Sequence, residues 1–500
     1  MVRIRTIVGL IVAVMASQAA AKYVDVRDPA RRERVVASLR EAGQNGLDAA
    51  LAAYDALQKQ QATLQEAILR YESDSTFDDV SYGKSSKATA PEDRLASDRR
   101  RMAEITAQLE AWRTAIDEIG SQRGCSVSRL YWHTDLAEAR AAAERTGRPI
   151  LSLRMLGKLT DEFSCANSRF FRTALYSNKE ISDYLRDNYV LHWQSVRPVP
   201  RVTIDFGDGR KLERTLTGNS AHYVLTSAGE PLDVLPGLYA PQQFRGWLAR
   251  MRKFHGTYIA ESPTDRPALL QAFHERRRDA IVRNWARDIQ QVSGREGTQL
   301  VTSRINAAIA IERRAGNDSP EAIDAAPVAV SKSGIEMPMM RFANLGGKWL
   351  ETGMDDDLWR AIANRYRERV KLDDASIAVM RAEFPNAAEA GRQAYSKMVQ
   401  EDPVLRVVRS FEDSMTLDTV RNEYLLHRRV HERFVEAAAS ADAAAIIADV
   451  DTLNEWVYAS LFLTPSADPW LGLAPRDVYT ALDNDGRTEP AATVASRSLR

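Results

Sequence analysis

The 500-residue sequence has only two cysteines, Cys125 and Cys165. A scaffold held by several disulfides is therefore excluded, and the pair can supply one bridge or one reactive site at most. Lysine and arginine together number 68, as do aspartate and glutamate, so the net charge is zero. Because no overall basic field favours nucleic acid or an anionic membrane surface, we predict no nucleic-acid partner.

The sequence also lacks the short motifs of several enzyme classes. It contains no Gly-x-Ser-x-Gly element, no phosphate-binding loop and no dinucleotide fingerprint. The segment Asp205–Gly209 lacks the ligand ladder of a calcium loop, and it fits a hairpin turn better. We therefore predict no cofactor.

Only the N-terminus carries a strongly apolar run, Ile7–Ala16. Arg3 and Arg5 precede this run and Ala19–Ala21 follow it, which is the order of a secretory signal peptide. The run is shorter than the ~20 residues that a membrane-spanning helix needs. We predict cleavage after Ala21, export to the periplasm or exterior, and no transmembrane segment in the mature protein.

Helical periodicity dominates both ends of the remaining chain. Apolar residues at helical spacing within 29–71 and 92–120 predict two helices that form an antiparallel hairpin, with a polar loop over Ser73–Pro91. A third helical section follows the middle of the chain, and the polar end is predicted to be disordered. The predicted organisation is a signal peptide (1–21), a helical hairpin (22–125), an α/β domain (126–256), an all-α domain (257–486) and a tail (487–500).

The middle section alternates strand and helix patterns, so the chain as a whole is predicted to be a mostly helical α+β multidomain protein. Asp208-Gly209 between two of the strands predicts a hairpin. The predicted strands are Ile150–Leu153, Tyr189–Trp193, Val202–Phe206, Lys211–Leu216, Ala221–Leu225 and Leu232–Leu235. The predicted helices are Thr134–Thr146, Ser168–Leu185 and Pro241–Arg252.

Several features of this middle section together resemble exported thioredoxin-like domains. They are Trp132, Ala137-x-x-x-Ala141, Arg148-Pro149-Ile150, Cys165 at a helix start, Tyr223-Val224-Leu225-x-x-x-Gly229-Glu230 and Gly237-Leu238-Tyr239. The resemblance covers about a quarter of the chain. It implies a central thioredoxin-like α/β domain flanked by the helical hairpin and the all-α domain.

The resemblance also implies a chemistry that this chain has only in part. The family uses Cys-x-x-Cys at a helix start, where the helix dipole stabilises the thiolate. Here the motif is Cys165-Ala166-Asn167-Ser168, so a serine replaces the resolving cysteine and a complete dithiol cycle is excluded. The family also has a cis-proline before the strand that matches Ala221–Leu225, whereas this chain has Ser220 and Ala221. That difference argues against the usual binding of substrate.

Two interpretations of Cys165 remain open. It is either a nucleophile that forms mixed disulfides, or it forms a disulfide with Cys125, as two lone cysteines in an oxidising compartment more often do. Such a bridge would stabilise the fold by about 4 kcal/mol in the chain-entropy model. We therefore favour an exported non-enzymatic binding or scaffolding protein with protein partners. The alternative is a monothiol thiol-disulfide oxidoreductase or isomerase with Cys165 as nucleophile.

Glu423, His427 and His431 form a possible metal site because they lie four residues apart on one helical face. Two histidines at this spacing chelate zinc or another transition metal, and the carboxylate would be a third ligand. In the other interpretation, these histidines belong to a buried seam with Tyr424 and Phe434. The sequence is not His-Glu-x-x-His, so no general base lies between the histidines.

Overall fold

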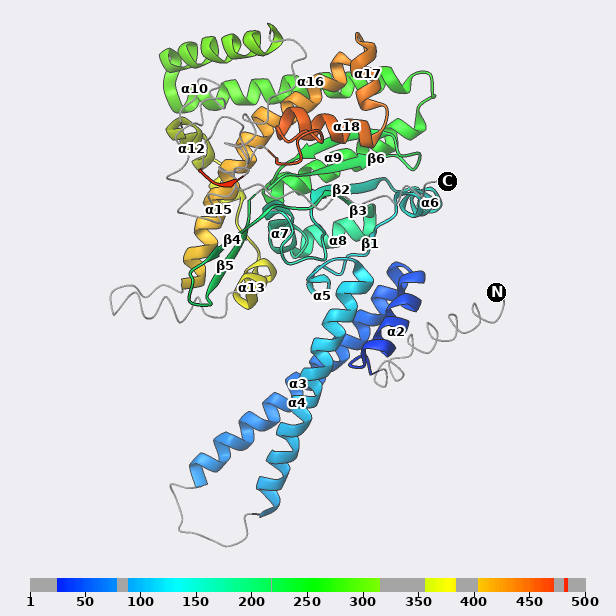
Figure 1. Cartoon of the computed structure of the whole chain (residues 1–500), viewed down its shortest axis with the longest axis vertical. Helices are drawn as coiled ribbons and strands as arrows, with labels where there is room; N and C mark the ends of the chain where they lie inside the picture. The colour runs from blue at the N-terminus through cyan, green and yellow to red at the C-terminus, as the bar shows by residue number, and fades with distance from the viewer. Residues whose placement is uncertain are drawn as a thin grey trace.

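The computed structural model describes residues 25–78, 89–216, 218–314, 356–383, 403–471 and 481–483. The predicted signal peptide (1–21) and tail (487–500) lie outside these residues. The described chain is mostly helical and contains a mixed five-stranded sheet and a two-stranded ribbon (Figure 1). This confirms the mostly helical α+β class. None of the helices in the described part combines the length and apolar character needed to cross a bilayer.

The N-terminal helices form an arm that projects from the rest of the molecule (Figure 1). Helix α2 (Pro29–Glu41) begins where the Asp28 carboxylate accepts a hydrogen bond from the Arg31 amide. Helices α3 (Gln44–Asp78) and α4 (Thr89–Gly120) lie side by side. Both extend into the segment that was predicted to be a polar loop, so that loop is shorter than expected. An apolar cluster at the base of the arm includes Leu51, Trp112 and Ile116.

The five-stranded sheet has the order β1-β3-β2-β6-β7. Strands β1 (Trp132–His133), β3 (Val190–Arg197) and β2 (Ile150–Leu156) are parallel to one another. Strand β6 (Ser220–Leu225) runs antiparallel to β2, and the edge strand β7 (Pro231–Pro236) runs antiparallel to β6. All residues of β2, β6 and β7 are buried, and most of them are apolar.

Helices connect the parallel strands, but the single helix predicted over Ser168–Leu185 is divided into shorter segments. Helix α6 (Leu136–Thr146) is capped by Asp135 and ends at Gly147, whose φ of 63° suits glycine. Three short helices then lie between β2 and β3, and α9 follows β7. Their bounds are α7 (Ala166–Phe170), η2 (Phe171–Leu175), α8 (Lys179–Asn188) and α9 (Pro241–Ala260).

The predicted Asp-Gly hairpin is confirmed. Strands β4 (Arg201–Asp205) and β5 (Lys211–Thr215) pair antiparallel as a separate ribbon. Gly209 in the turn has a φ of 92°, a conformation that glycine adopts without strain.

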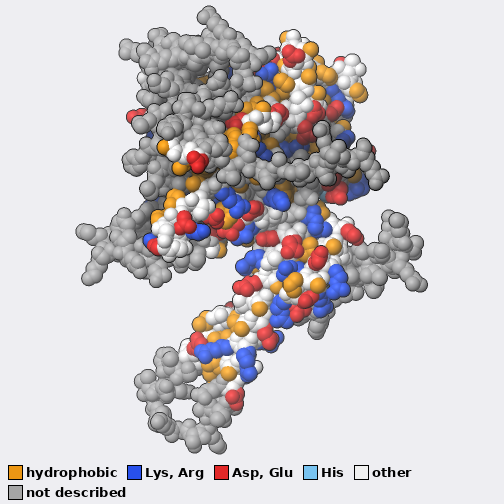
Figure 2. All heavy atoms as spheres, viewed as in Figure 1, with side chains coloured by type: hydrophobic (Ala, Val, Ile, Leu, Met, Phe, Trp, Pro, Cys, Tyr) orange, Lys and Arg blue, Asp and Glu red, His pale blue; other side chains and the backbone are white. Residues whose placement is uncertain are grey.

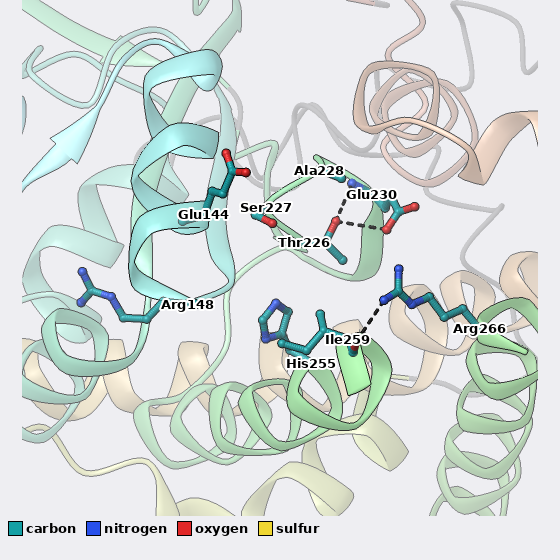
Figure 3. A pocket seen from close by; sticks show the side chains of 11 residues that line it. Glu144, Arg148, Thr226, Ser227, Ala228, Glu230, His255, Ile259 and Arg266 are labelled. Carbon is teal, nitrogen blue, oxygen red and sulfur yellow. Dashed lines mark hydrogen bonds between the residues drawn. The ribbon is translucent and has the colours of Figure 1, made fainter. Parts of the chain in front are cut away.

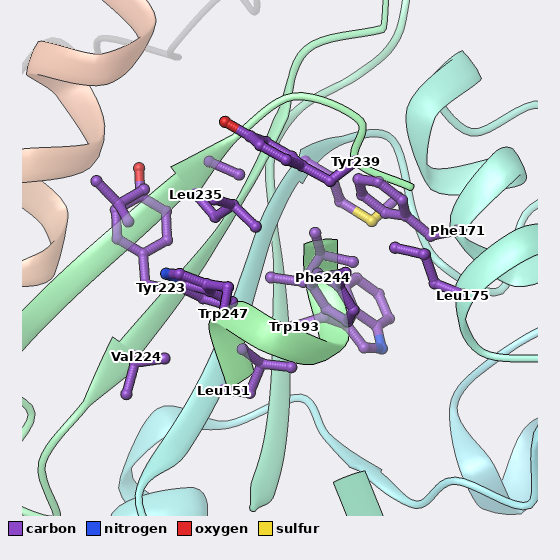
Figure 4. Close-up of a cluster of buried hydrophobic side chains, with 14 of the residues drawn as sticks. Leu151, Phe171, Leu175, Trp193, Tyr223, Val224, Leu235, Tyr239, Phe244 and Trp247 are labelled. Carbon is purple, nitrogen blue, oxygen red and sulfur yellow. The ribbon is translucent and has the colours of Figure 1, made fainter. Parts of the chain in front are cut away.

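The C-terminal helices share a hydrophobic core with the sheet. Phe411, Phe434 and Trp456 belong to the same cluster as Leu151 and Trp247. Figure 4 shows the sheet side of this core, where Tyr223, Phe244 and Trp247 lie close together. The C-terminal elements are α10 (Arg266–Arg314), α12 (Asp356–Asn364), η4 (Arg367–Arg369), α13 (Asp374–Glu383), α15 (Pro403–Arg421), η5 (Asn422–His427), α16 (Arg428–Glu436), α17 (Ala441–Ile447), α18 (Val450–Trp456) and η6 (Val457–Leu461). The domain boundaries stay predictions.

Candidate functional site

Cys165 lies at the start of a helix, as predicted, but its side chain is completely buried. It is the N-cap residue of α7 and belongs to the main hydrophobic core. Ser168 is also fully buried, and its hydroxyl lies 2.8 Å from both the Ser164 hydroxyl and the Cys165 carbonyl oxygen. The motif therefore forms part of the core in this structure.

The segment before β6 contacts the C-terminal end of the described chain. The Asn219 side-chain amide donates a hydrogen bond to the Thr464 hydroxyl over 3.1 Å, and the Tyr458 hydroxyl donates to the Asn219 carbonyl over 3.1 Å. Ser220 and Ala221, which follow in β6, are fully buried. Burial raises the pKa of Tyr458, and a charge on Cys165 would raise it further. Helix η6 and the residues after it thus hold the segment before β6 in place.

The predicted disulfide between Cys125 and Cys165 is absent, because both cysteines are free thiols. They are packed in different hydrophobic clusters, Cys125 at the base of the arm and Cys165 in the core around the sheet. The Cys125 sulfur lies 3.4 Å from the Leu130 carbonyl oxygen. Burial, assisted by the Asp117 charge, raises the pKa of the Cys125 thiol. Each cysteine behaves as a small apolar core residue.

The second candidate site is a buried cluster of histidines and carboxylates. The predicted residues Glu423, His427 and His431 come together, and β7 adds Asp233 to them. The His427 Nε2 atom lies 3.3 Å from Asp233 Oδ2, and its Nδ1 atom lies 3.0 Å from Glu423 Oε2. Glu423 and His427 belong to the π-helical turn η5, and such turns are frequent at functional sites.

A third histidine, His274 of α10, completes this cluster. Its Nδ1 atom lies 2.7 Å from Nδ1 of His431, and its Nε2 atom lies 3.0 Å from the Leu232 carbonyl oxygen. The other ring nitrogen of His431, Nε2, is buried and has no hydrogen-bond partner among the described residues. Asp233, His274, His427 and His431 are each at most 1% exposed. We refer to these four residues and Glu423 as the histidine cluster.

Charges within the histidine cluster shift the pKa values of its members. Burial opposes a charge on His427, but the carboxylates of Asp233 and Glu423 raise its pKa to about 9. Burial would raise the pKa of Asp233, yet the neighbouring imidazoles hold it well below its ordinary range. Burial lowers the pKa of His274 to about 4, and burial and His427 together lower that of His431. The ring of His427 thus lies between two carboxylates, which favour its charged form.

Sequence reasoning missed Asp233 and His274 because they are far from the other members in the chain. His274 is 157 residues from His431, and Asp233 is 194 residues from His427. One signal was present, since Asp233 lies within the apolar strand predicted over Leu232–Leu235. A buried strand rarely contains an aspartate without a partner.

A separate surface pocket of about 240 Å³ lies near the end of β6 (Figure 3). Several of its polar groups already bond within the chain. The Thr226 hydroxyl lies 3.2 Å from a Glu230 carboxylate oxygen, and Arg266 donates to the Ile259 carbonyl oxygen over 3.0 Å. Because these groups are already paired with one another or with the backbone, we assign no ligand to the pocket.

Comparison with known proteins found no match for this chain among family models, curated proteins or solved structures.

Proposed function

We propose that the chain is an exported, non-enzymatic binding or scaffolding protein built on a thioredoxin-like domain without redox activity. The observation that carries this proposal is the complete burial of Cys165 and Ser168. A thiol-disulfide enzyme needs an accessible thiolate to attack a disulfide sulfur. A cysteine inside the core cannot meet a protein disulfide unless the surrounding structure opens.

The strand order supports the thioredoxin-like part of the proposal. Three parallel strands are followed by the antiparallel pair β6 and β7, and then by α9. This agrees with the final hairpin and last helix that the sequence resemblance implies. Helix α7 begins directly after Cys165, as that resemblance also requires.

The C-terminal helices support the loss of redox function. In the family that the sequence resembles, the residues before the strand matching β6 shape the substrate groove. Here Asn219 bonds to Thr464 and Tyr458 instead. A protein substrate would have to displace this part of the chain, which disfavours the alternative of a monothiol enzyme.

The N-terminal arm is the surface that we assign to a protein partner. Helices α3 and α4 extend well beyond the globular part, and acidic, basic and apolar side chains are mixed on their visible face (Figures 1 and 2). Leu69 on α3 is a large apolar side chain that is 54% exposed. Mixed charge together with exposed apolar groups favours a protein partner over nucleic acid.

The redox part of the proposal is tested by insulin reduction with dithiothreitol. We expect wild-type protein and Cys165→Ser to be equally inactive, at the rate of dithiothreitol alone. Wild-type activity well above that rate and abolished by Cys165→Ser would establish the monothiol enzyme instead.

The binding part is tested in cells with a photo-crosslinking amino acid at position 69. The matched control is position 206, because Phe206 is 55% exposed but lies next to β4. We expect a discrete protein adduct from position 69 and none from position 206. Adducts from position 206 alone, or from neither position, would contradict a partner on the arm.

A further inference from the structure

We propose that Asp233, His427 and His431 bind a zinc ion that fastens the C-terminal helices to the edge of the sheet. One ligand atom from each of these residues lies within 4.8 Å of the other two, and all three residues are buried. The ligands come from β7, η5 and α16. An ion at this point would therefore join the last strand of the sheet to two consecutive helical segments.

The separation between His427 and Asp233 suits two ligands of one ion. Ligand atoms at about 2.0–2.1 Å from a tetrahedral zinc ion are ~3.3 Å apart. The distance from His427 Nε2 to Asp233 Oδ2 is 3.3 Å. Most N–H···O hydrogen bonds in proteins are shorter, at about 2.7–3.2 Å.

The hydrogen bonds of His274 fix the tautomer of His431. The Leu232 carbonyl oxygen can only accept, so Nε2 of His274 carries a proton and its Nδ1 is the acceptor. His431 must then donate from Nδ1 across the 2.7 Å contact, which leaves a lone pair on Nε2. That nitrogen is buried without a partner in the described part of the chain, a costly arrangement that coordination to a metal would relieve.

Glu423 is not one of the three ligands but orients one of them, His427. It accepts the Nδ1 proton of His427 over 3.0 Å, which directs Nε2 toward Asp233. A carboxylate behind a ligating histidine orients the ring and makes it a better donor. Asp233 is held in the same way, because Trp247 Nε1 donates to its Oδ2 over 2.9 Å.

The donor set indicates zinc among the common metals. Two imidazole nitrogens and one carboxylate oxygen suit Zn²⁺, whereas calcium and magnesium prefer oxygen ligands. The Glu423 and Arg277 side chains are 27% and 24% exposed, so one side of the histidine cluster approaches solvent. Zinc binds the neutral imidazole, so any proton on Nε2 of His427 is released to solvent as the ion binds.

The test measures zinc in the full chain by mass spectrometry after incubation with excess Zn²⁺ and gel filtration. We expect about one zinc per wild-type chain and less than a tenth of that in His431→Gln. The control is His255→Gln, because His255 is also buried and has a ring nitrogen that bonds to none of the described residues. This control should keep full zinc. A folded wild-type chain without zinc, or equal zinc loss in His431→Gln and His255→Gln, would overturn the proposal.

A second measurement tests the role of Glu423 behind the ligand His427, and it does not require that His431→Gln folds. Titration of metal-free wild type and Glu423→Gln with Zn²⁺ should give one site in each, with affinity about 10–100-fold weaker in the variant. Co²⁺ added to the wild type should give the intense visible absorption of four-coordinate cobalt. The weak spectrum of hexa-aqua cobalt, or an unchanged affinity in Glu423→Gln, would contradict the arrangement.

Discussion

Acid should destabilise this protein through histidines that are buried without charge, and His222 is the clearest case. His222 is 1% exposed, and burial lowers its pKa to about 3. Its ring nitrogen Nε2 lies 2.7 Å from the Tyr176 hydroxyl, between the rings of Phe171 and Phe244. The unfolded chain binds a proton at this histidine below a pKa of about 6.5, whereas the folded chain does not.

The sign and size of the effect follow from this difference in proton binding. The unfolded state binds more protons between pH 6.5 and about 3, so stability falls as the pH falls through that range. At pH 5, which is about 1.5 pH units below the unfolded pKa, the folded state has lost about 2 kcal/mol of stability at 1.36 kcal/mol per unit. This is a large part of the 5–15 kcal/mol that typically holds a domain folded.

Urea unfolding at pH 7 and pH 5 measures this contribution. His222→Gln keeps a hydrogen-bonding side chain beside Tyr176 but cannot titrate, so it should lose about 2 kcal/mol less than wild type between the two pH values. The control is Tyr176→Phe, which removes the hydroxyl and keeps the histidine, so it should show the wild-type pH dependence. Identical losses in wild type and His222→Gln would refute the reasoning.

Three further predictions concern the N-terminus, the arm and a helix cap. Mass spectrometry of the exported protein should find a mature N-terminus near Lys22. An intact Met1 would contradict the proposal that a signal peptide is cleaved on export. Gly120→Ala should lower the free energy of unfolding by about 1–3 kcal/mol, because a Cβ there would lie 2.1 Å from the Cys125 sulfur. Adding Cys125→Ala to this variant should restore part of the lost stability. If the two substitutions instead lower stability additively, the contact is contradicted. Asn178→Ala should cost about 1 kcal/mol in chemical unfolding, because the Asn178 side chain accepts from the Ile181 amide at the start of α8; an unchanged midpoint would contradict the cap.

Local sequence patterns predicted the sheet region well. All six predicted strands are present, and Asp208-Gly209 forms the expected hairpin. These features depend on short apolar runs, turn residues and caps that lie close together in the chain. The polar segment Ser73–Pro91 was predicted less well, because long helices such as α3 and α4 can continue through polar residues when a neighbouring helix supports them.

The candidate sites could be predicted only in part, because their remaining members are distant in sequence. The spacing of His427 and His431 predicts a shared face, but it cannot show that β7 brings Asp233 to that face. The disulfide between Cys125 and Cys165 was predicted only from the oxidising compartment expected for an exported protein. Their burial in separate clusters depends on tertiary packing that no local pattern contains.

The central claim is that Cys165 is a core residue, and thiol labelling of the native protein tests it most directly. Wild-type protein is treated with iodoacetamide in buffer and in denaturant, and modification of Cys165 is followed by peptide mass spectrometry. We predict labelling in buffer at least about a thousandfold slower than in denaturant, because exposure requires opening that costs several kcal/mol. Rapid, complete labelling of Cys165 in buffer would contradict the account and identify an accessible nucleophile.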